Sequence, residues 1–391
     1  MDPVANPFRP GAGRRPPLLA GRERELAAFD VTRRRCEELG EGDRPWVIHG
    51  LRGVGKTVLL GELLSQVSAR GWIVAKVEVA AGRPLPVALA RELQRALRTA
   101  TGRHEPGRLR RLLAVFSAFS LSLDPTGGLS VGLDIAPERG TADSGDLGVD
   151  LTALFEALGE AARDLGIGAL VLVDELQEAE TDELRALNTA VHQLGQGERP
   201  LPVIVVAAGL PSLPRLLAEV TSYAERMYDY RPLGSLGRPA AAAALTGPAD
   251  ALDVTWAPAA LDVALDSAQG YPYLVQATGK HVWDVAVRSP ISVEDAHLGV
   301  SAARAEVDDG LYRSRWERAT PRQRALLRAI ATLGGSEQVA VADLARELGR
   351  PTSGLSVARE EVLRKGLVYV PQRGFLRFSV PGMHTFVLRQ E

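Results

Sequence analysis

Cysteine is almost absent from this sequence of 391 residues, which holds only Cys36. A single cysteine excludes an internal disulfide and a metal centre built on several thiolates. Because an isolated cysteine behaves as a small apolar residue, we expect Cys36 to be a buried thiol. Functions that need paired or clustered cysteines are therefore excluded.

Long hydrophobic runs are also missing. No stretch approaches the roughly 18 to 20 apolar residues that a membrane-spanning helix needs. The opening MDPVANPFRPGAGRRPP lacks the apolar centre of a secretory signal. With 46% hydrophobic and 24% charged residues, the composition is that of a globular protein with two or three domains. The sequence therefore predicts a cytoplasmic protein with no membrane partner.

Lysine is scarce, with only Lys56, Lys76, Lys280 and Lys365 among 46 basic residues. The net charge is −2, but residues 312–391 hold 14 Arg and Lys against 7 Asp and Glu. A basic C-terminal segment fits a polyanionic partner, while a solvated surface is the simpler explanation. Against this background, a lysine inside a glycine-rich loop is informative.

That loop is HGLRGVGKTVLL, residues 49–60, which fits G-x-x-x-x-G-K-[ST] between an apolar run and a helical pattern. Such a loop turns its backbone N–H groups around phosphate oxygens at a helix N-terminus. We expect Lys56 to reach the β- and γ-phosphates of ATP and Thr57 to ligate Mg²⁺. A plain glycine turn is the alternative. The predicted nucleotide-binding residues are Gly50, Gly53, Val54, Gly55, Lys56, Thr57 and Val58.

A second motif, ALVLVDELQEAE, places two carboxylates after another apolar run. Residues 170–173 are apolar throughout, which is typical of a central strand in a parallel sheet. We expect Asp174 to hold Mg²⁺, directly or through water, and Glu175 to act as general base on the attacking water. Taken alone, the Asp-Glu pair has a helix N-cap as its alternative. Combined with the glycine loop, it predicts ATP hydrolysis with Lys56 and Glu175 as catalytic residues.

Further apolar runs at residues 72–79, 203–207 and 227–230 alternate with helical stretches. This order predicts an α/β fold, a parallel sheet with helices on both faces and the ligand at the carboxyl ends of the strands. An insertion at about 105–148 contains FSLSLDPTGGLSVGLDI, residues 119–135. Its alternation of apolar and polar residues predicts a β-hairpin that decorates the domain or contacts a protein.

The C-terminal part contains three helical patterns followed by two short alternating runs. Thr320 before Pro321 is a helix start, and Gln372-Arg373-Gly374 is a turn between the two runs. Three helices and a hairpin predict a winged helix-turn-helix whose third helix enters the DNA major groove. Because that helix is nearly neutral, protein docking or packing on the rest of the chain is the alternative. The predicted DNA-binding residues are Arg350, Ser353, Ser356, Arg359 and Arg373, with Glu360 beside them.

In the order LLAGRERELAAF, HGLRGVGKT, LVDELQEA and AAGLPSLPRLL, the sequence resembles P-loop ATPases of the AAA+ and STAND type. It is most similar in pattern to archaeal-type ATPases and the origin-recognition initiator clade, and its opening resembles actinobacterial ATP-binding proteins. The resemblance covers residues 5–290 and implies an AAA+-like fold with ATP and Mg²⁺ as cofactors. It also implies that Gly21 and Arg22 lie beside the adenine, whereas a capped first helix is the alternative.

Two features depart from the AAA+ pattern. The strand that ends at Ala207 continues without the usual polar sensor residue, which only Ser212 could replace. QGYPYLVQATG resembles the Gly-x-Pro lid motif of STAND proteins, which implies that Tyr271 and Pro272 pack on the base; a helix-start turn is the alternative.

The resemblance further implies an arginine finger that reaches a neighbour's nucleotide in a homo-oligomer. Arg226 is the first candidate and Arg215 the second, and an ordinary surface position is the alternative for both.

The predicted domains are a flexible segment at 1–17, a P-loop ATPase domain at 18–234, an α-helical lid at 235–308 and a winged-helix domain at 309–391. The sequence thus predicts an ATP-driven, Mg²⁺-dependent switch that is coupled to duplex DNA through its C-terminal domain. A STAND-like signalling or scaffold ATPase, whose winged helix contacts a protein partner or its own lid, is the alternative.

Overall fold

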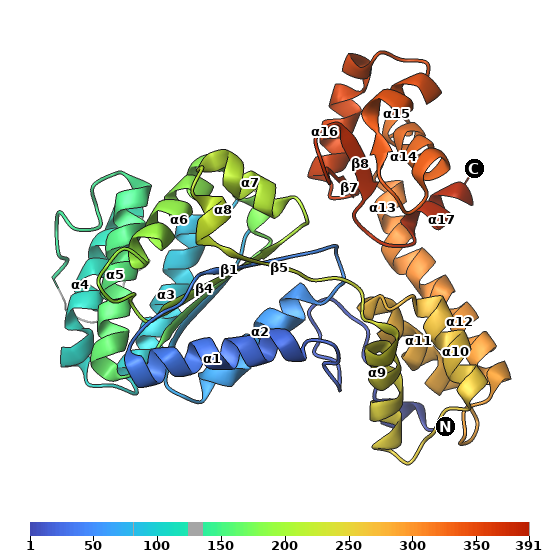
Figure 1. The fold of residues 1–391 in the computed structure, drawn as a ribbon, viewed down its shortest axis with the longest axis horizontal. Coiled ribbons are helices and arrows are strands. Elements are labelled where there is room, and N and C mark those ends of the chain that lie inside the picture. The colour runs from blue at the N-terminus through green and yellow to red at the C-terminus, as the bar shows by residue number, and fades with distance from the viewer. Residues whose placement is uncertain (81, 124–135, 391) are drawn as a thin grey trace.

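The computed structural model describes residues 1–80, 82–123 and 136–390. Three parts follow one another along the chain (Figure 1): a domain with a central sheet, a helical lid, and a smaller C-terminal unit. The N-terminus lies beside the lid rather than beside the sheet. The carboxyl ends of the sheet strands face the region where the three parts meet.

A five-stranded parallel sheet in the order β2-β3-β4-β1-β5 forms the centre of the first part. The two inner strands β3 and β4 are buried at every position, as their uninterrupted apolar sequences require. The strands are β1 (Trp46–His49), β2 (Ile73–Glu78), β3 (Ala169–Asp174), β4 (Val203–Gly209) and β5 (Asp229–Pro232).

Helices cover both faces of this sheet (Figure 1), which confirms the predicted α/β fold. They are α1 (Glu23–Leu39), α2 (Lys56–Ser68), α3 (Leu85–Thr101), α4 (Pro106–Leu123), α5 (Leu147–Leu165), α6 (Thr181–Leu194), α7 (Leu213–Val220) and α8 (Ala224–Met227), with a 3₁₀ turn at Leu176–Glu178.

The predicted hairpin is wrong for its first residues. Residues 119–123 form the last turns of α4, and residues 124–135 lie outside the described part of the chain. Phe116 and Phe119 are fully buried three positions apart, and α4 packs on α5. The alternation of residues 119–123 also fitted a strand, but the helical spacing of the buried Phe116 and Phe119 determines the structure. The last strand likewise begins at Asp229 rather than Met227, because residues 224–227 form α8.

The lid consists of α9 (Arg238–Asp250), α10 (Pro258–Ala268), α11 (Pro272–Val285) and α12 (Val293–Val307). The first residues of the chain, predicted to be flexible, pack against it. Phe8 is 3% exposed and lies on Gly279, and the Trp283 indole N–H donates to the Asp2 carbonyl at 3.0 Å. A π-helical turn (Asp308–Arg313) and α13 (Ser314–Glu317) continue α12 toward the C-terminal unit.

The C-terminal unit has its own core and a three-stranded antiparallel sheet in the order β6-β8-β7. Thr320 and Gln323 form a capping box at the start of its first helix. The helices and the hairpin lie where the sequence predicts them, and the winged-helix interpretation stays a prediction. The elements are α14 (Pro321–Gly334), β6 (Val339–Ala340), α15 (Val341–Glu347), a 3₁₀ turn at Thr352–Leu355, α16 (Ser356–Arg364), β7 (Val368–Tyr369), β8 (Phe375–Phe378) and α17 (Met383–Leu388).

Cys36 is fully buried in α1, and burial raises the pKa of its thiol to about 12. This confirms its role as a core residue. In the described ranges, no helix is both long enough and apolar enough to cross a membrane.

Candidate functional site

The glycine loop joins β1 to α2 at the carboxyl edge of the sheet. Gly55 has a φ of 96°, which favours glycine, and it caps the N-terminus of α2. The buried Lys56 ammonium donates to the carbonyls of Gly50 at 2.9 Å and Leu51 at 3.0 Å. Burial lowers the pKa of Lys56, while nearby Glu175 and Asp174 act in the opposite direction. The ammonium thus lies inside the loop, where an anion would meet it.

The two predicted metal ligands are in direct contact. Thr57 Oγ1 donates to Asp174 Oδ2 at 2.6 Å, although the residues belong to different elements. Asp174 is 3% exposed, and its other oxygen accepts from the Glu175 N–H at 2.9 Å. A hydroxyl and a carboxylate beside a phosphate-binding loop match the ligands that Mg²⁺ takes in nucleotide sites, where water and phosphate complete its shell. The donor set therefore fits a magnesium–triphosphate complex.

Glu175 directly follows β3 in a left-handed conformation, with a φ of 52°. Non-glycine residues seldom adopt this backbone, and functional sites are where they concentrate. Its Oε1 lies 3.4 Å from Arg52 Nη1, and its Oε2 accepts from Gln177 Nε2 at 2.5 Å. The predicted general base is therefore held on both oxygens, by a residue of the glycine loop and by a residue of its own turn.

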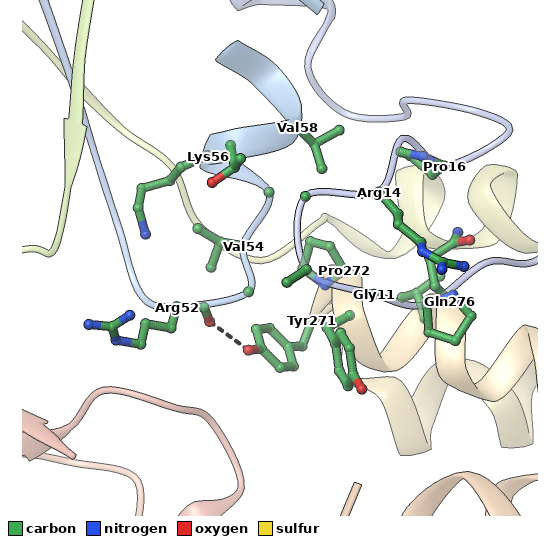
Figure 2. Close-up of a pocket in the computed structure, with 18 of the residues that line it drawn as sticks. Gly11, Arg14, Pro16, Arg52, Val54, Lys56, Val58, Tyr271, Pro272 and Gln276 are labelled. Atoms are coloured by element: carbon green, nitrogen blue, oxygen red, sulfur yellow. Dashed lines mark hydrogen bonds between the residues drawn. The ribbon is translucent and has the colours of Figure 1, made fainter. Parts of the chain in front are cut away.

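Arg52 connects all three parts of the molecule, and the sequence analysis did not predict this. Its N–H donates to the Ser379 carbonyl of the C-terminal unit at 3.2 Å. Its carbonyl accepts from the Tyr271 hydroxyl of the lid at 2.5 Å, drawn as a dashed line in Figure 2. No sequence signal could have singled it out, because it stands at an unspecified position of the glycine-loop motif and the chain is rich in arginine.

Tyr271 packs directly on the glycine loop. It is 2% exposed, and a Cβ at Gly53 would lie 2.0 Å from its hydroxyl oxygen. Tyr271 is also the N-cap of α11, after Gly270 at a φ of 68°, and Pro272 is the first residue of that helix. Residues 270–272, the predicted Gly-x-Pro motif, therefore start a helix and also contact the glycine loop.

Arg22 holds the loop from the opposite side. Its guanidinium donates to the carbonyls of Val54 at 3.0 Å and Gly234 at 2.9 Å, and burial lowers its pKa. Gly21 does not line the cavity, although the resemblance placed it beside the adenine. It has a φ of 70° and lies against Leu236, in the segment that joins β5 to α9.

A cavity lies between the glycine loop, the lid and the N-terminal segment. Figure 2 shows Arg52 and Lys56 on one side of the loop and Arg14 and Pro16 on the other. Among its described lining residues, Glu175 is the single carboxylate. Such an excess of positive charge favours a polyanion such as a triphosphate. The cationic lining residues are Arg9, Arg14, Arg22, Arg52, Lys56 and Arg315, and the predicted residues Gly53, Val54, Gly55, Thr57, Val58 and Pro272 also line the cavity.

The predicted arginine fingers do not face this cavity. Arg226 is exposed in α8, and the strand after it pairs Asp229 with Trp46, the first residue of β1. Arg226 therefore lies at the edge of the sheet opposite the glycine loop. Arg215 pairs with Glu219 on α7 at 2.6 Å. A finger role would require a second copy of the chain, so it stays a prediction.

The predicted DNA-binding residues lie on the C-terminal unit, near the start of α16 and at the turn between β7 and β8. All are exposed except Arg359, which is partly buried. The end of α16 faces the glycine loop instead, since a Cβ at Gly366 would lie 2.8 Å from Arg52 Nη2. The exposed residues are Arg350, Ser353, Ser356 and Arg373.

Comparison with known proteins gives matches for two segments. Residues 18–206 match the AAA ATPase domain, and residues 309–387 match a domain of unknown function, DUF8462. No protein with a curated description matches the chain.

Among solved structures, the chain is similar to the Walker-type ATPase of Pyrococcus abyssi. The TM-score is 0.61 at 17% identity, covering 98% of this chain and 99% of that one. It is also similar to RuvB of Thermotoga maritima, a Holliday junction branch migration motor, with a TM-score of 0.45, 16% identity and coverage of 96% and 99%. The Orc1 protein of Aeropyrum pernix, in complex with DNA, gives a TM-score of 0.43, 17% identity and coverage of 95% and 92%.

The likeness to the Pyrococcus abyssi ATPase shows that the fold is shared over almost the whole chain. The match at residues 18–206 supports an AAA+ P-loop ATPase domain. It also supports nucleotide hydrolysis as the general activity of such a domain. The roles of single residues, the STAND-like features and DNA binding stay predictions.

Proposed function

We propose that this chain is an ATP-driven switch, a Mg²⁺-dependent ATPase whose nucleotide state is passed to the C-terminal unit and through it to duplex DNA. The 2.6 Å contact between Thr57 and Asp174 carries the ATPase part of the proposal. It brings together, next to Lys56 and Glu175 at one edge of the sheet, the hydroxyl and the carboxylate that we propose as the metal ligands.

The residues divide the work of hydrolysis between them. When bound, the magnesium–ATP complex supplies the phosphoryl group that is transferred to water. Lys56 and the loop N–H groups hold the phosphates, and Thr57 with Asp174 holds the metal. Glu175 accepts a proton from the attacking water. The adenine ring would lie against the apolar side of the cavity, which includes Pro16 and Pro272.

Arg52 provides the coupling to the other two parts of the chain. With ATP bound, the Arg52 guanidinium, which lies 3.4 Å from Glu175, would pair with the γ-phosphate in place of Glu175, because both groups are anions that it can bind. Any movement of the Arg52 backbone then acts on Ser379 and Tyr271, which are hydrogen-bonded to it. Two states that differ in these contacts are sufficient for a switch.

Duplex DNA is the partner that fits the charge of the C-terminal unit. Residues 312–391 carry twice as many basic as acidic side chains, and Arg350 and Arg373 are exposed on it. The alternative is a signalling or scaffold ATPase. Its C-terminal unit would bind a protein partner, or would contact the glycine loop of its own chain through Ser379.

ATP turnover by the wild type and Glu175→Gln, with and without duplex DNA, tests the catalytic part. We expect wild-type turnover, a higher rate with DNA, and a variant that still binds ATP but does not hydrolyse it. Equal ATP binding without turnover by either protein would mean that Glu175 is not the base.

DNA binding at several salt concentrations tests the coupling. Each phosphate contact contributes a slope of about −0.9 to the dependence of log affinity on log salt. We expect Arg350→Ala and Arg373→Ala to weaken binding and flatten this slope, whereas Arg110→Ala, an exposed residue on α4, leaves both unchanged. Binding that none of these variants changes would favour the alternative function.

A further inference from the structure

The turn after β3 contains a side chain that the predicted mechanism does not use. Gln177 is partly buried between two chemically different neighbours. Its Oε1 accepts from the Leu210 N–H at the end of β4 at 3.0 Å. Its Nε2 donates to Glu175 Oε2 at 2.5 Å. One amide thus bridges the carboxyl end of a neighbouring strand and the candidate general base.

The orientation of this amide is fixed by its partners. A backbone N–H can only donate, so the Leu210 N–H must meet the carbonyl oxygen of Gln177. The NH₂ group therefore points to the carboxylates, and it also lies 3.3 Å from Glu178 Oε1. A charge-assisted hydrogen bond of this kind is stronger than a neutral one and strongly directional.

The end of β4 is shaped to admit the amide. A Cβ at Gly209 would lie 2.6 Å from Gln177 Oε1, so only glycine leaves the space free. Ser212, the polar residue that the sequence offered near this strand end, does not line the cavity. A side chain from the β3 turn therefore occupies the position in front of β4.

We infer that Gln177 is the positioning residue for Glu175, and this inference rests on the proposed ATPase function. Arg52 holds the other carboxylate oxygen at the longer distance of 3.4 Å, and it belongs to the loop that must accommodate phosphate. Gln177 is instead anchored on the backbone of a central strand. It keeps the carboxylate directed at the cavity when Arg52 turns to the nucleotide.

Three variants separate positioning from packing. Gln177→Leu removes both hydrogen bonds at similar size. Gln177→Glu keeps the acceptor for Leu210 but places a carboxylate against Glu175. Gly209→Ala keeps Gln177 but displaces its amide, and it also presses on the Leu213 side chain, 2.7 Å from the added Cβ. Gln193→Leu, an exposed residue on α6, is the matched control.

We expect each of the three variants to lower kcat by about 10-fold to 100-fold, since small misplacements of a catalytic group have effects of this size. KM and the affinity for a fluorescent ATP analogue should stay within about twofold, because Gln177 does not line the cavity and the three variants leave the phosphate-binding groups in place. Gln177→Glu keeps the size of the side chain, so a loss of kcat in this variant reports on the lost hydrogen bond and the added charge at Glu175 rather than on lost packing volume. A kcat in Gln177→Leu equal to that of the control, in an enzyme that Glu175→Gln inactivates, would overturn the inference.

A measurement without nucleotide tests the same contact. Urea unfolding of Gln177→Leu, Glu175→Gln and the double variant gives the coupling between the two side chains. We expect the destabilisations to be non-additive, whereas strict additivity would contradict the contact. Absence of ATP binding and turnover in the wild type would instead overturn the proposed function, and this inference with it.

Discussion

His49 ends β1 directly below the glycine loop, and burial, followed by the charge of Lys56, lowers the pKa of its imidazole. The folded chain therefore resists protonation, whereas the unfolded chain titrates near the ordinary value of 6.5. The stability that results is fully present above this value and is lost as the pH falls through the lowered folded pKa.

Substitution of His49 should make the protein less sensitive to acid. We expect His49→Gln to lose less free energy of unfolding than the wild type between about pH 7 and about pH 5, measured with urea. His297→Gln, at an exposed position on α12, should follow the wild type. A difference between wild type and His49→Gln that is constant over this range would contradict the prediction.

Tyr228 and Asn188 form a buried polar pair in the sheet domain. The Tyr228 hydroxyl donates to Asn188 Oδ1 at 2.8 Å, and Asn188 Nδ2 donates to Thr221 Oγ1 at 2.7 Å. Tyr228→Phe leaves a buried acceptor without its donor, which costs about 1–3 kcal/mol of unfolding free energy. Tyr223→Phe, at a partly buried ring, should cost less than about 0.5 kcal/mol. Equal effects of the two variants in urea unfolding would show that the pair is not stabilising.

Among the elements, those that depend on local pattern were predictable. The apolar runs of β3 and β4, the glycine loop and the Asp174-Glu175 pair each carry their signal within about ten residues. Residues 119–123 were assigned wrongly because a stretch of five residues fits a period of 2 and a period of 3.6 almost equally well. The burial of Phe119 against α5, which decided the outcome, is a tertiary contact.

The contacts that complete the site could not be read from the sequence. Tyr271 and Arg52 lie 219 positions apart along the chain, and Gln177 and Leu210 lie 33 apart. Both separations are too long for a local sequence pattern to show that the two residues are in contact. Arg315 reaches the cavity only because α12 and α13 bring the chain back over the loop.

The packing of α11 on the glycine loop can be tested by a substitution of Gly53. Gly53→Ala places a methyl group where the Tyr271 hydroxyl lies, at a φ of 80° that alanine disfavours. We expect faster amide exchange in α11 from Val275 onward and a loss of about 1–3 kcal/mol of unfolding free energy. Gly61→Ala, whose added Cβ meets no neighbour in α2, should instead stabilise the protein by up to about 1 kcal/mol. Unchanged exchange in α11 of Gly53→Ala would refute the contact.

At the scale of the whole molecule, the C-terminal unit rests on the ATPase domain through a small contact around Gly366, Ser379 and Arg52. The buried Ser379 donates its hydroxyl to the Gly366 carbonyl, so the two residues act together. A contact of this size is suited to opening and closing, because interfaces within a chain are open to relative motion unless they are large and apolar.

Gly366→Ala tests whether the Arg52 side chain holds the C-terminal unit, because the added methyl group displaces the guanidinium from Gly366. The added Cβ would lie 2.8 Å from the Arg52 guanidinium, at a φ of 63°. We expect a larger radius of gyration in small-angle scattering and a lower energy-transfer efficiency between dyes on the two parts. Gly349→Ala has a similar φ of 59° but open space around its Cβ, so it controls for backbone strain alone. The same dimensions in both variants would show that the Arg52 guanidinium does not hold the unit in place.

The hydrogen bond from the Arg52 N–H to the Ser379 carbonyl also has a consequence for biosynthesis. The glycine loop leaves the ribosome early, and folding during translation proceeds from the N-terminal side. The loop cannot acquire this contact until residue 379 has been added and has emerged from the exit tunnel. A nascent chain therefore exposes a loop without its C-terminal partner, and the coupled site is assembled only at a late stage of synthesis.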